Sequence, residues 1–237
     1  MPDVILHLTD VEKIYGALRP LRLRELVLHA GESVALTGVD GPAAAVLVDL
    51  ITGAVLPDRG EVVAFGAPTA APSDGDAWLA SLERFGILSE RAVLLEAMTV
   101  AQNLALPFSV ALNPIPDTVM ADVLRLAAEV GCAESDLSSR VGDADPLMRA
   151  RVRLARALAT APDLLLAEHP NALVSADQTA ALGADLSRVT AARGITALTL
   201  TADVRFARSV ASRVLRVDPA TGAVKDVPAW TAWFGRG

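Results

Sequence analysis

Hydrophobic and polar positions alternate in the first part of the chain and then give way to short apolar runs. The segments "VILHLTDV" (4–11) and "LRLRELVLH" (21–29) alternate with a period of two, which is typical of antiparallel strands with one exposed face. After a turn at Gly31, the run "SVALTG" (33–38) is almost wholly apolar and predicts a buried strand.

From Ser33 onward the pattern predicts helices and strands in alternation, which favours a parallel sheet. The segment Pro68–Asp76 is rich in proline, alanine and aspartate and predicts a loop, and "VLLEAMTVAQNLALPF" (93–108) could begin a helical region. Helices are predicted near 42–53, 117–131, 146–162, 178–194 and 204–213, and strands within 57–66, 85–89, 163–169 and 195–203, with a hairpin at 214–224.

Composition narrows the class of protein. Of the 237 residues 52% are hydrophobic and 4% aromatic, and the mean hydropathy of +0.41 suits a sheet covered on both faces or a subunit that buries surface against a partner. No apolar run reaches the length of a bilayer span, and the start "MPDVILHLTD" lacks the features of a signal peptide. The single cysteine, Cys132, excludes an internal disulfide framework, so we expect a cytoplasmic protein. A net charge of −7 argues against nucleic acid as a partner.

Several segments, taken in order along nearly the whole chain, resemble the ATP-binding cassette (ABC) ATPase family of bacterial transporters. They are "VEKIYG", "LVLHAGESVALTG", "LITGAVLPDRGEVVAFG", "AMTVAQNLALPF" and "RVRLARALATAPDLLLAEHP". The resemblance implies an α/β fold with a P-loop NTPase-like three-layer core, a small antiparallel β subdomain and an inserted helical subdomain. It implies one domain over 1–237, in which 1–90 and 160–237 form the core with the β subdomain and about 91–159 form the helical subdomain.

The family's phosphate loop reads G-x-x-G-x-G-K-[ST], and this chain departs from it at three positions. Backbone N–H groups of such a loop hold phosphates, its lysine reaches the β- and γ-phosphates, and its hydroxyl binds Mg²⁺. The third glycine is Ala43, the lysine is Ala44 and the hydroxyl is Ala45, while Pro42 has no N–H and Asp40 adds a negative charge. The predicted remnant of the nucleotide loop comprises Gly38, Val39, Asp40, Gly41, Pro42, Ala43, Ala44, Ala45 and Val46, with Tyr15 as the adenine-stacking aromatic residue.

The other positions that the resemblance makes functional are altered too. Glu168 stands where the family has the metal-binding aspartate, His169 where it has the catalytic glutamate, and Glu90 where it has a glutamine. The signature sequence aligns with Ala144–Met148, where Pro146 and Leu147 replace paired glycines. The dimer-contacting aspartate aligns with Ser175 and the switch histidine with Ala202.

Together these positions predict a degenerate ABC-type ATPase subunit, a non-hydrolysing structural or regulatory component of a transporter complex. We expect no ATP or Mg²⁺ unless the site is rewired, and we assign no catalytic residue and no metal ligand. Expected partners are a membrane permease subunit, a second ABC ATPase subunit, or both, with dimerisation possible, at the inner face of the cell membrane.

Two alternatives stay open. The first is a working ATPase with an atypical site that uses Glu168, His169 and Glu90 on a metal. The second is a soluble scaffold or sensor that binds another small ligand in the old nucleotide cleft.

Two further features have less specific interpretations. Arg149, Arg151, Arg153 and Arg156 lie in one predicted helix, and the acidity of the chain favours a solvated face over a polyanion site. The tail "VPAWTAWFGRG" carries two of the three tryptophans and could pack on the body or on a partner.

Overall fold

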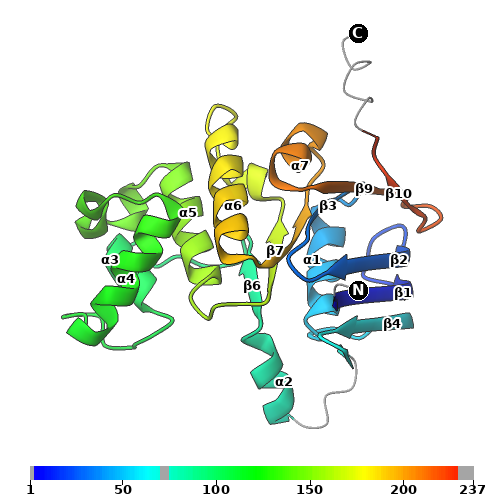
Figure 1. Ribbon diagram of the computed structural model, residues 1–237, viewed down its shortest axis with the longest axis horizontal. Helices are drawn as coiled ribbons and strands as arrows, with labels where there is room; N and C mark the ends of the chain where they lie inside the picture. Colours follow the sequence, from blue (N-terminus) through cyan, green and yellow to red (C-terminus); the bar gives the residue numbers. More distant parts are fainter. Residues whose placement is uncertain (1–2, 70–74, 229–237) are drawn as a thin grey trace.

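The computed structural model describes residues 3–69 and 75–228, which form two sheets with helices around them (Figure 1). Strands of the first sheet run in the order β2-β1-β4-β5, and those of the second in the order β10-β9-β3-β8-β7-β6. The strands are β1 (Val4–Lys13), β2 (Leu21–His29), β3 (Ser33–Thr37), β4 (Arg59–Ala64), β5 (Ala67–Pro68), β6 (Phe85–Leu88), β7 (Leu164–Glu168), β8 (Thr196–Leu200), β9 (Arg213–Val217) and β10 (Val224–Asp226). The helices are α1 (Gly41–Ile51), α2 (Gly75–Leu82), α3 (Val100–Ala105), α4 (Asp117–Val130), α5 (Pro146–Ala157), α6 (Thr179–Arg193) and α7 (Val204–Val210), with short 3₁₀ turns at Glu134–Ser138, Val141–Asp143 and Pro170–Leu173.

The two alternating segments form an antiparallel pair, as their period predicts. β1 pairs with β2 on one side and with β4 on the other, both antiparallel. Leu6 and Leu8 in β1 are fully buried, whereas the alternate positions His7 and Thr9 are half-buried and exposed. The sheet therefore buries one face against the rest of the molecule.

The second sheet is parallel apart from its edge strand β10, and both of its faces are covered. Side chains of successive strand residues point to opposite faces. Leu164 and Leu166 pack in one cluster with α1 and the antiparallel sheet, and Leu165 and Ala167 pack in another with α5 and α6. This arrangement explains why the β7 segment is a continuous apolar run.

Figure 1 shows α3, α4 and α5 gathered at one end of the molecule and the antiparallel sheet at the other, with the parallel sheet between them. The predicted fold class, a P-loop NTPase-like α/β core with an antiparallel sheet and helices inserted between β6 and β7, is confirmed. The division into a core and a helical subdomain of about 91–159 stays a prediction. Within the described residues, no helix combines the length and apolar composition that a bilayer span requires.

Two sequence expectations are wrong. The predicted loop Pro68–Asp76 is shorter than expected at both ends, because Ala67–Pro68 pairs with β4 and α2 begins at Gly75.

The arginines of α5 do not form a solvated face, because each one donates to a fixed acceptor. Arg151 reaches Asp185, Arg153 and Arg156 reach the carbonyls of Ala92 and Val93, and Arg149 reaches those of Val141 and Gly142. Trp230 and Trp233 of the tail lie outside the described residues.

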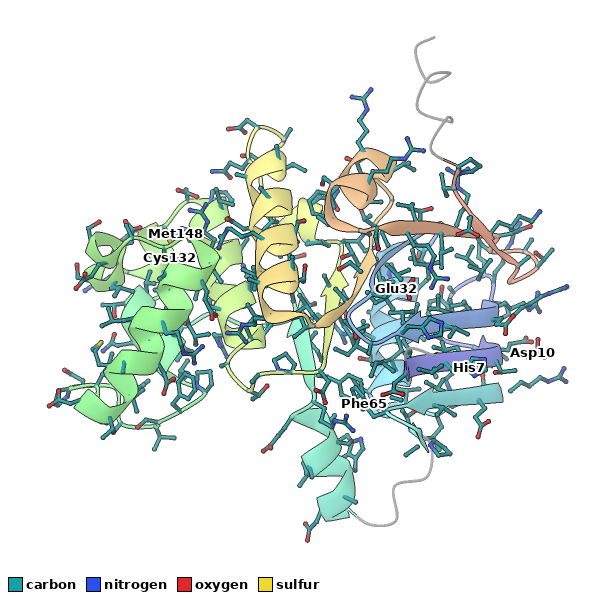
Figure 2. All side chains as sticks on the ribbon, in the orientation of Figure 1. His7, Asp10, Glu32, Phe65, Cys132 and Met148 are labelled. Atoms are coloured by element: carbon teal, nitrogen blue, oxygen red, sulfur yellow. The ribbon has the colours of Figure 1, made fainter. Side chains whose placement is uncertain are left out.

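Cys132 is buried among the helices, where its thiol lies 3.3 Å from the Met148 thioether sulfur (Figure 2). Burial raises the pKa of the Cys132 thiol to about 12, so the reactive thiolate is scarce at neutral pH. We expect iodoacetamide to alkylate the native protein at pH 8 at least about 100-fold more slowly than the urea-unfolded protein. Mass spectrometry can follow the reaction at this one cysteine, and equal rates in the two states would contradict the burial.

Candidate functional site

The candidate site lies at the edge of the parallel sheet that is formed by the carboxyl ends of the neighbouring strands β3, β8 and β7. Ligands of open α/β sheets bind at this edge, because loops and helix N-termini converge there. The loop from Gly38 to Asp40 follows β3, and Glu168 and His169 stand at the end of β7. The fold therefore brings the predicted remnant loop and the two predicted acid–base positions to one edge.

The N-terminus of α1 is already capped by a carboxylate of the chain itself. Asp40 Oδ1 accepts a hydrogen bond from the Ala43 N–H at 2.8 Å, and the Asp40 carbonyl accepts one from the Ala44 N–H at 2.8 Å. An N-cap aspartate satisfies helix N–H groups that would otherwise be free to bind an anion. Pro42, in the first turn, supplies no N–H. Asp40 thus occupies part of the donor set that a phosphate would use.

The alanines of the loop are largely inside the protein. Ala44 is fully buried and Ala43 nearly so, and both pack with Leu47 in the cluster between α1 and the sheets. Alanine has the highest helix propensity, so these positions extend α1 without offering a polar group. The loop keeps its helix and has no side chain that could reach a phosphate or a metal at positions 43 to 45.

Tyr15 lies close enough to the loop to sense its charge. Its phenol is half-buried, and burial first, then the negative charge of Asp40, raise its pKa. The ring packs against the hydrophobic cluster that contains Ala43 and Ala44 of the remnant loop. Whether it stacks on a base stays a prediction.

Glu168 is bound by two side chains that come from the segment after β6. Its Oε2 accepts from Ser89 Oγ at 2.6 Å and from Arg91 Nε at 3.2 Å, and its Oε1 accepts from Arg91 Nη2. Glu168 is only 9% exposed, whereas Arg91 is half-exposed. The paired guanidinium compensates the burial of the carboxylate, because an ionised group in the interior needs an opposite charge.

Arg91 also reaches α1. Its Nη1 donates to Asp49 Oδ1 at 3.0 Å, so one guanidinium joins α1, the end of β7 and the segment after β6. Its hydrogen bond to Glu168 raises the pKa of Arg91 further, so the group is a permanent cation. Sequence analysis missed Arg91, Ser89 and Asp49. Arg91 and Glu168 are 77 residues apart, and no local pattern pairs them.

His169 and Glu90 do not join Glu168 in a metal cluster. His169 adopts a left-handed conformation with φ of 41°, and its backbone N–H donates to the Leu200 carbonyl at 2.8 Å. The buried ring nitrogen Nε2 of His169 has no hydrogen-bond partner in the structure. Glu90 is exposed. Among residues 3–69 and 75–228, no group of three or more His, Cys, Asp or Glu side chains could hold a metal ion. The described structure therefore does not gather Glu168, His169 and Glu90 into one three-ligand group, and a rewired site that uses them stays a prediction.

The segment aligned with the signature forms the start of α5. Asp145 caps this helix, because its Oδ1 accepts from the Met148 N–H at 3.0 Å, and Pro146 follows at the first helical position. Next to the switch position Ala202, Asp203 caps α7 in the same way. The Ser175 hydroxyl donates to Gln178 Oε1 at 2.9 Å. The starts of α5 and α7 are thus capped by carboxylates of the chain.

A Mg²⁺–nucleotide complex does not fit these residues as they stand. The loop offers no lysine and no hydroxyl, and its Ala43 N–H already donates to the Asp40 carboxylate. The guanidinium of Arg91 donates to both oxygens of Glu168.

The glycine turn after β3, the helix α1 behind it and the acidic end of β7 define the architecture of a P-loop nucleotide site. The chain belongs to the ABC transporter family, whose defining sequence pattern matches residues 21–172. This membership confirms the resemblance drawn from the sequence.

Similar proteins include import proteins of several bacteria. The chain is 28% identical over 228 residues to "Methionine import ATP-binding protein MetN" of Brucella abortus, covering 95% of this chain and 60% of that protein. It is 31% identical over 229 residues to the protein of the same name in Caulobacter vibrioides, covering 92% of this chain and 67% of that protein. "Phosphonates import ATP-binding protein PhnC" of Hyphomonas neptunium is 28% identical over 238 residues, with 97% and 90% covered. The chain thus spans about 60% of the length of the Brucella relatives.

Solved structures share the fold. The ATP-binding cassette MJ0796, solved as a dimer bound to ADP and Pi, superposes with a TM-score of 0.74 at 20% identity, covering 95% of this chain and all of that one. The cbiO1 protein of Clostridium perfringens, part of the transporter complex cbiONQ, gives 0.77 at 19% identity, with 94% and 87% covered. At such identities the likeness establishes the fold alone.

Proposed function

We propose that this chain is a subunit of an ABC transporter complex that does not itself turn over ATP. The observation that carries the proposal is the capped α1. Its N–H at Ala43 binds the carboxylate of Asp40, and no lysine follows it. Helix N-termini bind phosphate because their N–H groups are free and their dipole favours negative charge. A fixed carboxylate at the same terminus weakens both effects.

The start of α5 supports the same proposal. In this family a nucleotide is sandwiched between the phosphate loop of one subunit and the signature of the other. Asp145 and Pro146 close the signature helix of this chain, as Asp40 and Pro42 close α1. The chain would then weaken its own site and the site that it completes on a partner.

The ATP-binding, ATP-hydrolysing alternative draws its support from the relatives. MetN and PhnC are both named ATP-binding import proteins, and those names favour a nucleotide-binding subunit over a non-hydrolysing one. The residues of this chain favour the other interpretation, since Ala44 replaces the lysine that contacts the phosphates.

The proposed partners are a membrane permease subunit and a second ABC ATPase subunit. The relatives named as import proteins support this assembly. It would place the chain in the cytoplasm, at the inner face of the membrane. The role there would be structural or regulatory.

Binding and hydrolysis of Mg-ATP by the purified chain test the proposal. We expect isothermal titration calorimetry to show no saturable binding at millimolar nucleotide, and a phosphate-release assay to show no turnover. Tyr15→Ala should change neither result, because the ring would have no base to stack on. Tight binding that is lost in Tyr15→Ala would refute the proposal and establish the ATP-binding alternative.

The scaffold or sensor alternative has its own measurement. A thermal-shift screen over nucleotides and inorganic anions would reveal another ligand of the cleft, because a ligand that binds only the folded state raises its unfolding temperature. A flat response would count against this alternative.

A further inference from the structure

We propose that the Arg91 guanidinium is a built-in cation that stands where a P-loop nucleotide site holds its metal ion, and that it excludes a divalent cation from Glu168. The inference rests on the proposed function and deepens it, because it states how the acidic end of β7 stays neutralised without a metal.

The position of the guanidinium follows from two helix residues and one strand residue. P-loop sites hold Mg²⁺ between a hydroxyl in the first turn of the loop helix and an acid at the end of the second strand. These positions are Ala45 in α1 and Glu168 in β7. Ala45 and Asp49 are four residues apart and therefore lie on one face of α1.

Arg91 bridges from that face to the strand. Its Nη1 donates to Asp49 at 3.0 Å, and its Nε donates to Glu168 at 3.2 Å. The planar, permanently charged guanidinium suits such a bridge, because it can bind two carboxylates at once. It therefore lies between the end of β7 and the face of α1 that carries Ala45, one helical turn beyond that residue.

The donors around Glu168 leave no set of ligands for a divalent cation. Sites that hold Mg²⁺ supply one or two carboxylates, and waters or phosphates complete its octahedral shell. Both oxygens of Glu168 already accept N–H or O–H groups. Ser89 Oγ directs its proton to Glu168 and accepts a hydrogen bond from the backbone N–H of Arg91 at 3.1 Å. Ala45 contributes no oxygen. A metal could bind Glu168 only after Arg91 had left.

The burial of Glu168 distinguishes this pair from an ordinary surface ion pair. Arg84 and Asp163 form a pair at 2.6 Å in which both side chains are close to half-exposed. In the Arg91 pair the carboxylate is 9% exposed, so it requires a counter-charge. In a chain without the loop lysine and without a metal ligand at position 45, Arg91 supplies that charge.

Binding of Mn²⁺ in the absence of nucleotide tests the inference. Free Mn²⁺, measured by electron paramagnetic resonance, reports binding to the wild type, to Arg91→Met and to the matched control Arg84→Met. Methionine preserves most of the side-chain length and removes the charge. We expect Arg91→Met to bind Mn²⁺ at least about tenfold more tightly than the wild type, because a nearby positive charge no longer repels the ion. Arg84→Met should resemble the wild type, and Glu168→Gln should abolish the gain when it is added to Arg91→Met.

The opposite results would overturn it. A folded Arg91→Met that gains no Mn²⁺ binding contradicts the inference, as does a gain that survives Glu168→Gln. If Arg91→Met does not fold, Mn²⁺ binding by the wild type and by Glu168→Gln tests the inference instead. Saturable Mn²⁺ binding by the wild type that Glu168→Gln removes would refute the built-in cation, and the same Mn²⁺ signal in both proteins would support it. Because no nucleotide is present, ATP turnover by the wild type would refute the proposed function and leave this result standing.

Discussion

Gly38→Ala should lower the free energy of unfolding by roughly 3–5 kcal/mol, the largest effect that we expect from adding one methyl group. Gly38 has φ of +90°, and a Cβ there would lie 2.3 Å from the Val217 carbonyl oxygen at the end of β9. The left-handed conformation strains any residue with a Cβ, and the contact forces β3 and β9 apart. Equilibrium unfolding in urea, followed by circular dichroism, measures the change.

Gly41→Ala is the matched control in the same loop. A Cβ at Gly41 meets nothing within 4 Å, and its φ is not positive. Alanine at the first residue of α1 should leave stability unchanged or raise it by up to about 1 kcal/mol, because it restricts the unfolded chain. Equal losses in the two variants would show that the carbonyl of Val217 does not constrain the loop. The outcome also bears on function, since the contact gives a reason to keep Gly38 that requires no phosphate.

Glu168→Ala should cost about 2–4 kcal/mol of stability, because it removes the buried acceptor of three hydrogen bonds from two side chains. The Ser89 hydroxyl would lose its acceptor, and Arg91 would retain only Asp49, which is partly exposed. Glu168→Gln should cost less, because its amide oxygen can still accept from Ser89. Urea unfolding of the wild type, Glu168→Ala and Glu168→Gln ranks their free energies of unfolding.

Asp163→Ala provides the comparison for an exposed pair. It removes the partner of Arg84 at a site where both side chains are close to half-exposed, and such pairs contribute about 0–1 kcal/mol. A loss in Asp163→Ala as large as that in Glu168→Ala would mean that burial does not set the importance of the Glu168 pair.

Much of the fold follows from local pattern. The period-two segments predicted β1 and β2, and the continuous apolar run of β7 predicted a strand covered on both faces. The glycine after 117–130 predicted the end of α4. α2 was missed, because Gly75 and Asp76 favour a loop locally while Trp78 is held by a hydrogen bond from its Nε1 to the Thr52 carbonyl at 3.1 Å. That bond joins parts of the chain that no local window contains.

The sequence by itself determined the family, the order of strands and helices apart from α2 and β5, and the loss of the loop lysine, because periodicity and motif spacing are properties of neighbouring residues. Only the tertiary structure decided what stands in place of the missing groups. Asp40 caps α1 through a contact three residues away, but Arg91 meets Glu168 across 77 residues and Asp49 across 42. Such partners are chosen by the packing of β6, β7 and α1 around one edge of the sheet, where a buried carboxylate requires a charge that the local sequence does not supply.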